Sequence, residues 1–121
     1  VRPTYKWPFR VELSEWGGLT IDQVAHCLEL ELRCEVARPY VPLTNSPLYQ
    51  PHSDPARRIG ADYWGRIDPA RYRCPNADAF YATVLLIEHA AGLDPRFPEA
   101  FVEAVLKIQS NARAIAAALK D

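Results

Sequence analysis

The sequence predicts a small α/β (α+β) domain, a two-layer sandwich in which about three strands pack against helices. Two observations carry this prediction. Apolar residues alternate with polar ones from Phe9 and form an unbroken run near Thr83–Ile87, which indicates strands. Elsewhere, apolar residues recur at helical spacing, which indicates helices that pack against the sheet.

The first strand is predicted from the alternation of Phe9, Val11 and Leu13 with polar residues. The residues before it, from Val1 to Lys6, have no regular pattern and look like the end of a connection from an upstream segment. After Trp16-Gly17-Gly18 ends the strand, the chain is expected to turn toward a helix.

That helix is predicted at Ile21–Leu32, where Thr20 and Gln23 form a capping box. A short second strand is expected at Arg33–Val36. Prolines then stop regular structure, and the proline-rich segment from Tyr40 to Ser53 is expected to be a loop.

Two brief helices are predicted next. Asp54-Pro55 indicates an N-cap and a first helical residue, with the helix reaching about Tyr63 or Trp64. Asn76 indicates a second cap, for a helical turn through Phe80.

The third strand is predicted at Thr83–Ile87, central in the sheet and covered on both faces. A last helix starts near Asp94 and Pro98. Its apolar positions are expected at Phe101, Val105, Ile108, Ala112, Ile115 and Leu119. The predicted order is strand, helix, strand, loop with a short helix, strand, helix, all in one domain over residues 1–121.

Composition excludes several classes of partner. The net charge is only −1 and the basic residues are scattered, so neither nucleic acid nor an acidic membrane surface is expected to bind. The longest apolar stretch falls far short of the ~20 residues of a membrane span. We therefore expect a soluble, cytoplasmic protein. The three cysteines lack the spacing of a metal site and are expected to be reduced, mostly buried thiols, with no metal bound.

Candidate site residues are few. His89 stands at the end of the apolar strand, a position that can meet a ligand, although it can equally satisfy local backbone groups. Tyr49 and His52 lie in the proline-rich loop, where they can reach a neighbouring pocket or simply pack. His26 is expected on the flank of the first helix.

Enzymatic machinery is not evident in the residues themselves. A pyridoxal-phosphate enzyme needs a lysine that binds the cofactor, a carboxylate near the pyridine nitrogen and phosphate-binding groups. Lys6, Lys107 and Lys120 occupy an entry segment, a solvated helix face and a chain end, and none is expected to be buried or poised. We therefore expect neither catalytic nor cofactor-binding residues in this chain.

Six segments in order resemble one family, the DegT/StrS group of fold-type I aminotransferases that act on sugars and cyclitols. The opening Tyr5–Val11 resembles the first strand of the family's C-terminal small domain, and Gly17–Glu31 its first helix. The other resembling segments are Arg38-Pro39-Tyr40 with Pro47-Leu48-Tyr49, Cys74–Asp78, Thr83–His89, and Val102–Asn111. The similarity is closest to the scyllo-inosose and aminohydroxybenzoate branch. This chain has Glu88 where the family commonly has proline.

The resemblance implies a function for the whole protein. A complete member uses pyridoxal 5'-phosphate to move an amino group from glutamine or glutamate to a keto sugar or ketocyclitol, and works as a dimer. This chain would be its small domain, partnered by a large domain or subunit that is absent here, with His89, Tyr49 and His52 near the substrate. The alternative is a non-catalytic binding or regulatory module derived from that domain. A broad apolar surface left bare would favour the first reading.

Overall fold

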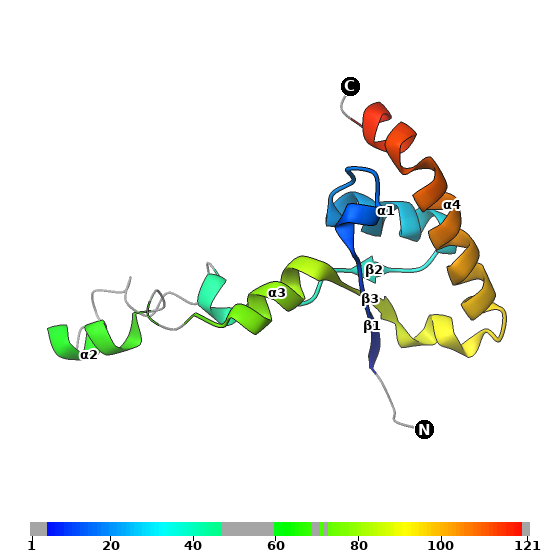
Figure 1. Ribbon diagram of the computed structural model, residues 1–121. Helices are drawn as coiled ribbons and strands as arrows, with labels where there is room; N and C mark the ends of the chain where they lie inside the picture. The colour runs from blue at the N-terminus through cyan, green and yellow to red at the C-terminus, as the bar shows by residue number, and fades with distance from the viewer. Residues whose placement is uncertain (1–4, 47–59, 69–70, 72, 120–121) are drawn as a thin grey trace. The chain divides into compact units, whose positions relative to one another are not determined.

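The computed structural model describes residues 5–46, 60–68, 71 and 73–119 of the chain (Figure 1). These residues belong to two compact units. We call Val1–Pro39 together with Ala82–Asp121 the sheet unit, and Tyr40–Tyr81 the insert unit. The α+β fold class predicted from the sequence is confirmed by the elements of the sheet unit.

The sheet unit contains a three-stranded antiparallel sheet with the order β1-β3-β2. Strand β1 spans Lys6–Arg10, β2 spans Val36–Ala37 and β3 spans Val84–Glu88. Trp7 and Val36, on the two outer strands, both lie opposite Ile87. The predicted central position of the third strand is confirmed. Its second face is covered less completely, because Leu86 is only partly buried.

Pro8 protects the open edge of this sheet. The Val11 N–H donates to the Thr83 carbonyl oxygen at 2.7 Å, just beyond the paired residues of β1. In an antiparallel pair, alternate residues of a strand direct their backbone N–H and C=O groups toward the partner strand. Phe9 and Trp7 therefore direct these groups toward β3, as Val11 does, whereas those of Pro8 point away from the sheet. The N–H that proline lacks would have pointed away from the sheet. Pro8 therefore weakens any pairing with a further strand without costing a bond to β3.

Helix α1 spans Ile21–Leu32, as predicted, and its capping box is present. Its buried positions are Ile21, Val24, Ala25 and Leu28. Full burial of an aliphatic side chain such as Leu28 stabilises a fold by roughly 1.5–3 kcal/mol. This inner face, rather than helix propensity alone, anchors α1 to the sheet.

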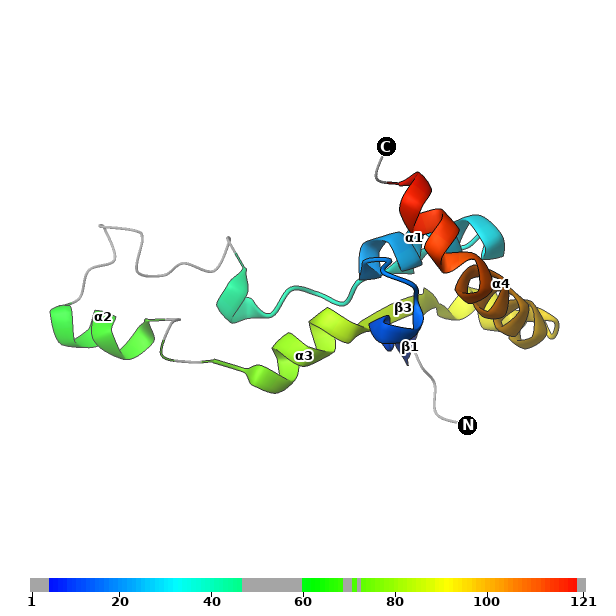
Figure 2. The ribbon, with the colours of Figure 1, turned by 45° about the horizontal axis from the view of Figure 1, so that its top comes forward.

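Helix α4 spans Phe97–Ala118 and packs beside α1 (Figures 1 and 2). Ile108 and Ala112 are buried as predicted, but Ala104 and Ala116 are buried too, whereas Leu119 is exposed and follows the helix. Alanines give a weak hydrophobic signal in sequence. In the fold, small side chains allow close approach, and a Cβ added at Gly17 would lie 2.9 Å from the Cβ of Ala112.

Both helices share one core with the sheet. Leu85 of β3, Leu28 of α1 and Ile108 of α4 belong to the same buried cluster, and the ring of Phe9 meets the ring of Phe101 edge-on at 5.2 Å. The predicted two-layer arrangement is thus confirmed for the sheet unit. No helix in the part of the chain that the structure describes has the length and apolar character needed to cross a membrane.

The predicted boundaries of two strands are wrong. The first strand starts at Lys6, inside the segment that had no pattern, and ends at Arg10, so that Leu13 lies in a 3-10 turn instead. The second strand begins only at Val36, because Arg33 adopts a left-handed φ of 54° and closes α1 through its N–H bond to the Glu29 carbonyl oxygen. In both cases, residues that the alternating pattern had assigned to a strand lie instead in a turn next to it.

The insert unit holds a 3-10 turn at Leu43–Asn45, helix α2 at Ala61–Ile67 and most of helix α3 at Pro75–Thr83. The predicted start of a helix at Asp54-Pro55 lies outside the described residues. The predicted turn at Asn76–Phe80 is longer than expected, since it starts at Pro75 and includes Thr83, which had been assigned to the third strand. The Asn45 side-chain amide donates to the Asp78 carboxylate at 2.6 Å and ties the 3-10 turn to α3.

The cysteines are all free. Cys27 and Cys34 are partly buried, and this burial raises the pKa of both thiols, which makes them poor nucleophiles. Cys74 is exposed, so the prediction of mostly buried thiols is wrong for this residue. It sits just before α3, where Pro75, rather than an Asn76 cap, begins the helix.

Candidate functional site

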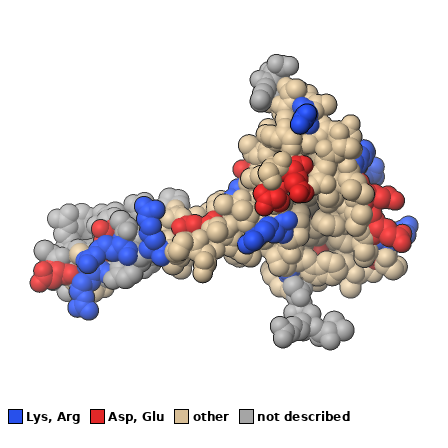
Figure 3. Space-filling view, viewed as in Figure 1, with Lys and Arg blue, Asp and Glu red and all other residues tan. Residues whose placement is uncertain are grey.

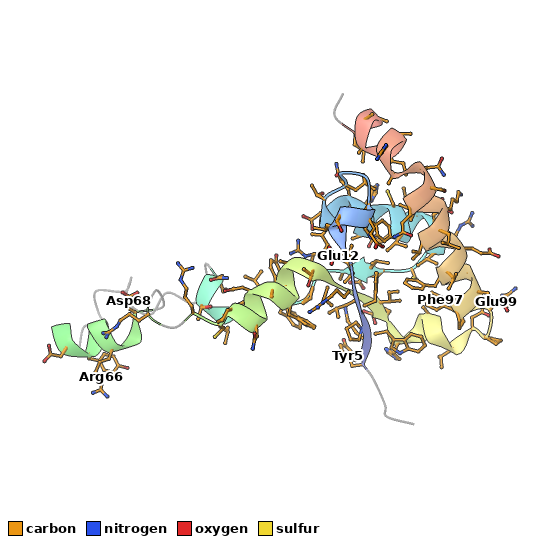
Figure 4. The ribbon with its side chains drawn as sticks, viewed as in Figure 1. Tyr5, Glu12, Arg66, Asp68, Phe97 and Glu99 are labelled. Atoms are coloured by element: carbon orange, nitrogen blue, oxygen red, sulfur yellow. The ribbon has the colours of Figure 1, made fainter. Side chains whose placement is uncertain are left out.

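His89 directly follows β3, as the sequence predicted, and opens the 3-10 helix His89–Leu93. Because the sheet is antiparallel, the carboxyl end of β3 lies beside the amino end of β1, with Lys6 opposite Glu88. This register brings Tyr5, at the start of β1 in Figure 4, to His89. We call Tyr5, Lys6, Glu35, Glu88 and His89 the strand-end cluster.

The imidazole of His89 is oriented by Tyr5. Its Nδ1 lies 3.0 Å from the Tyr5 carbonyl oxygen, and the two rings stack with centroids 6.0 Å apart. A carbonyl oxygen can only accept a hydrogen bond, so the neutral imidazole must carry its proton on Nδ1. Nε2 is then left as an acceptor on a side chain that is 53% exposed. The arrangement can accept a hydrogen bond from a ligand hydroxyl or N–H group.

Lys6 and Glu88 form the charged part of the cluster. The Lys6 ammonium lies 2.7 Å from the Glu88 carboxylate and 3.8 Å from that of Glu35, and Glu88 also lies 3.8 Å from Nδ1 of His89. The hydrogen bond between Lys6 and Glu88 raises the pKa of the lysine and lowers the pKa of the carboxyl group. Both groups are therefore held in their charged forms at neutral pH.

Other residues singled out in the sequence lie elsewhere. Tyr49, His52 and Lys120 are outside the described residues. His26 is exposed on α1, with its Nδ1 4.0 Å from the Glu29 carboxylate, and Lys107 pairs with Glu31 at 2.8 Å. Among the residues that the structure describes, no three His, Cys, Asp or Glu side chains are grouped to hold a metal ion.

An apolar cavity beside β1 was not predicted from the sequence. It has a volume of about 290 Å³ and is lined only by carbon-rich side chains. We call it the β1–α4 groove; its lining residues are Trp7, Pro8, Phe9, Ile87, Phe97, Pro98, Phe101 and Val102. Of these residues, Phe97 is labelled at the start of α4 in Figure 4. The sequence does contain aromatic residues near both ends of the chain that could have indicated such a cavity. Their proximity, however, depends on how the strands pair and how α4 packs.

Three aromatic rings that line the groove contact one another in sequence. Trp7 meets Phe97 edge-on at 6.3 Å, and Phe97 stacks with Phe101 at 6.2 Å. Gly92 is required beneath Trp7, because a Cβ at this position would overlap the indole ring. The sequence places small residues around Gly92, and this allows Trp7 to lie along the groove.

Comparison with known proteins identifies relatives of the chain. It is 32% identical over 90 residues to the L-glutamine:2-deoxy-scyllo-inosose aminotransferase of Streptomyces lividus, covering 74% of this chain and 21% of the relative. It is 31% identical over 117 residues to the aminotransferase of the same name from Streptomyces kanamyceticus, covering 96% of this chain and 27% of the relative. The chain is related to these aminotransferases.

The resemblance to the scyllo-inosose branch inferred from the sequence is thus confirmed. The aminotransferase of the same name from Streptomyces paromomycinus is similar at 30% identity over 90 residues. No family model matches the chain. The chain spans only about a quarter of the length of these aminotransferases.

Proposed function

We propose that this chain is the C-terminal small-domain part of a pyridoxal-phosphate-dependent aminotransferase of the DegT/StrS group. The complete enzyme would transfer an amino group from glutamine or glutamate to a ketocyclitol or keto sugar. The observation that carries the proposal is the match over 117 residues, nearly the whole chain, to a glutamine:ketocyclitol aminotransferase. A match of this length leaves little of the chain for an unrelated role.

The described residues do not fit the cofactor itself. A lysine that binds pyridoxal phosphate must lose its proton, which burial or a neighbouring cation favours. Lys6 has the opposite surroundings, because Glu88 raises its pKa, and Lys107 is paired with Glu31. In this proposal the cofactor, which stabilises negative charge on carbon during amino transfer, is held by the rest of the protein.

The contribution proposed for this chain is to binding of the acceptor. A cyclitol or sugar presents many hydroxyl donors, and Nε2 of His89 and the Glu35 carboxylate are acceptors in one cluster. Tyr5 is 72% exposed and its ring lies beside that of His89, where it can cover a face of the acceptor ring. Tyr49 and His52 remain proposed substrate-binding residues.

The β1–α4 groove supports the small-domain reading over the alternative of an independent binding module. Exposed apolar surface next to a cavity is typical of a surface that another part of a protein covers. On the face of the sheet unit in Figure 3, charged side chains form small groups between broad uncharged areas. A large domain or subunit as partner, a dimeric assembly and a cytoplasmic location belong to the same proposal.

Purification of the protein from its source tests the proposal. Intact and native mass would be measured together with the visible absorbance of bound pyridoxal phosphate. We expect these 121 residues within, or attached to, a much larger coloured polypeptide. A lone colourless chain of 13.7 kDa would contradict the proposal and favour the binding module.

A further inference from the structure

We propose that the β1–α4 groove is the docking surface for a segment of the aminotransferase that lies outside these 121 residues, and that this segment inserts an apolar side chain flanked by Lys or Arg. This inference rests on the proposed function, since it names the partner of the small domain and where it binds. Three features of the groove carry it.

The first feature is apolar surface that the sheet unit leaves accessible. Trp7 is 41% exposed and Val102 is 55% exposed, although both line a cavity made only of apolar side chains. One turn further along α4, Leu106 is 60% exposed. Exposed aromatic and aliphatic side chains gathered at a cavity are typical of the anchor pockets in protein interfaces.

The second feature is the size and chemistry of the groove. At about 290 Å³ it is slightly smaller than the ~300–1,000 Å³ of small-molecule pockets, and the Trp7 indole N–H is the one side-chain hydrogen-bonding group among its lining residues. A polyhydroxylated substrate would lose hydrogen bonds to water there without replacing them. One or two apolar side chains of a protein segment fit better.

The third feature is the charge at its border. Pro98 and Val102 are shared with a neighbouring hollow that is also lined by Glu99 and Glu103. These two glutamates are four residues apart on α4, where like charges repel by a few tenths of a kcal/mol. Glu99 is labelled on the outer side of the helix in Figure 4. A basic residue next to the apolar anchor would relieve this repulsion.

The remainder of the protein supplies an occupant of suitable length. The match covers only 27% of the Streptomyces kanamyceticus relative, so roughly three-quarters of such an enzyme lies outside the aligned stretch. Pro8 at the open edge of β1 disfavours addition of a strand. The segment is therefore expected to dock through side chains rather than by extending the sheet.

The test uses a chimera in which this chain replaces the aligned 117-residue stretch of the Streptomyces kanamyceticus enzyme. Oxidative footprinting would compare Trp7, Phe97 and Val102 in the chimera and in the isolated 121-residue chain. We expect at least ~5-fold slower oxidation of these residues in the chimera. Equal oxidation in a chimera that is active would overturn the inference while leaving the proposed function intact, and a chimera that folds and binds cofactor but does not aminate would contradict the proposed function.

Matched variants add a second readout. Val102→Glu places a charge in the groove, whereas Leu30→Glu places the same charge on α1, where Leu30 is 66% exposed and outside the groove. We expect Val102→Glu to lower kcat/KM of the chimera by ~10-fold or more and Leu30→Glu to change it less than ~2-fold. Circular dichroism of both variants in the isolated chain controls for misfolding. Equal effects of the two variants would overturn the inference.

Reversing the border charge tests the chemistry of the partner segment. The double variant Glu99→Lys, Glu103→Lys leaves the apolar side chains of the groove in place. It reverses the charge at the border, so that the border repels a basic segment. We expect reduced protection of Trp7 at low salt, with partial recovery at high salt. Unchanged protection at both salt concentrations would overturn the assignment of a basic flank.

Discussion

At the scale of single residues, Asp94 fixes the turn that leads into α4. Its carboxylate accepts the backbone N–H of Arg96 at 2.9 Å and the guanidinium of Arg96 at 2.8 Å. The hydrogen bond from the Arg96 side chain is the largest cause that lowers the pKa of Asp94, to about 2. The ionised carboxylate thus stabilises the start of α4.

This ion pair predicts a pH dependence of stability. The folded pKa of Asp94 is below its unfolded value of about 3.9, so its contribution is complete above pH ~4 and is lost as the pH falls through about 2. Asp94→Asn should lower Tm slightly at pH 7, and most of the difference from the parent chain should be lost at pH 2. Thermal unfolding at pH 7, 4 and 2 measures this. An equal difference in Tm at pH 7 and pH 2 would contradict the assignment.

His89 carries a second residue-scale prediction. Because Tyr5 offers only a carbonyl oxygen to Nδ1, long-range ¹⁵N NMR at pH 8 should find His89 protonated on Nδ1 and unprotonated on Nε2. His26 is the internal control, since its Nδ1 has no closer contact than the Glu29 carboxylate at 4.0 Å, and the Nε2–H form preferred in water should predominate. A predominantly Nε2-protonated His89 would remove the acceptor proposed for substrate hydroxyls.

The sequence predicted the place of His89 but not its partners. An apolar run followed by histidine locates that side chain at a strand end from local pattern alone. Tyr5 and Lys6 lie more than eighty positions before His89 and Glu88, and the two ends of the chain meet only through the antiparallel register. Trp7 on β1 and Phe97 on α4 are also distant in the sequence, and their rings meet only in the folded chain. Single-sequence periodicity contains no information on register.

At the scale of elements, the capping box of α1 is the most local determinant of structure. The Thr20 hydroxyl accepts the Gln23 N–H at 3.3 Å, and the Gln23 side chain accepts the Thr20 N–H at 2.8 Å. Thr20→Ala removes the first bond and should lower the free energy of unfolding by about 1 kcal/mol, within a usual range of about 0.5–2. Thr20→Ser is the matched control and should retain most of this stability. Chemical denaturation measures both, and identical losses would contradict a capping role.

Local signals predicted the long elements better than the short ones. Helix α1 was predicted with its observed bounds because its cap residue directly precedes the helix and its apolar face lies within it, so both signals are local in the sequence. The two-residue strand β2 was misplaced, since Arg33 closes α1 in a left-handed conformation that no pattern around it indicates. The extension of α3 to Thr83 was missed because a β-branched residue beside an apolar run reads as strand.

At the scale of the whole molecule, the sheet unit has a well-packed core but exposes apolar side chains at its surface. Leu28 and Leu85 are fully buried, so the sheet and the two packed helices have a well-formed interior. The β1–α4 groove nevertheless leaves Trp7 and Val102 accessible. A chain related to a quarter of an aminotransferase should have such a surface, which supports its assignment as a small domain.

Amination by the chimera described above tests this assignment most directly. Purified chimera would be supplied with glutamine, pyridoxal phosphate and 2-deoxy-scyllo-inosose, and formation of the amino product would be measured against the parent Streptomyces kanamyceticus enzyme and against that enzyme without the aligned stretch. We expect a folded, cofactor-binding chimera with amination well above that of the truncated enzyme. A chimera that folds and binds cofactor but aminates no better than the truncated enzyme would contradict it.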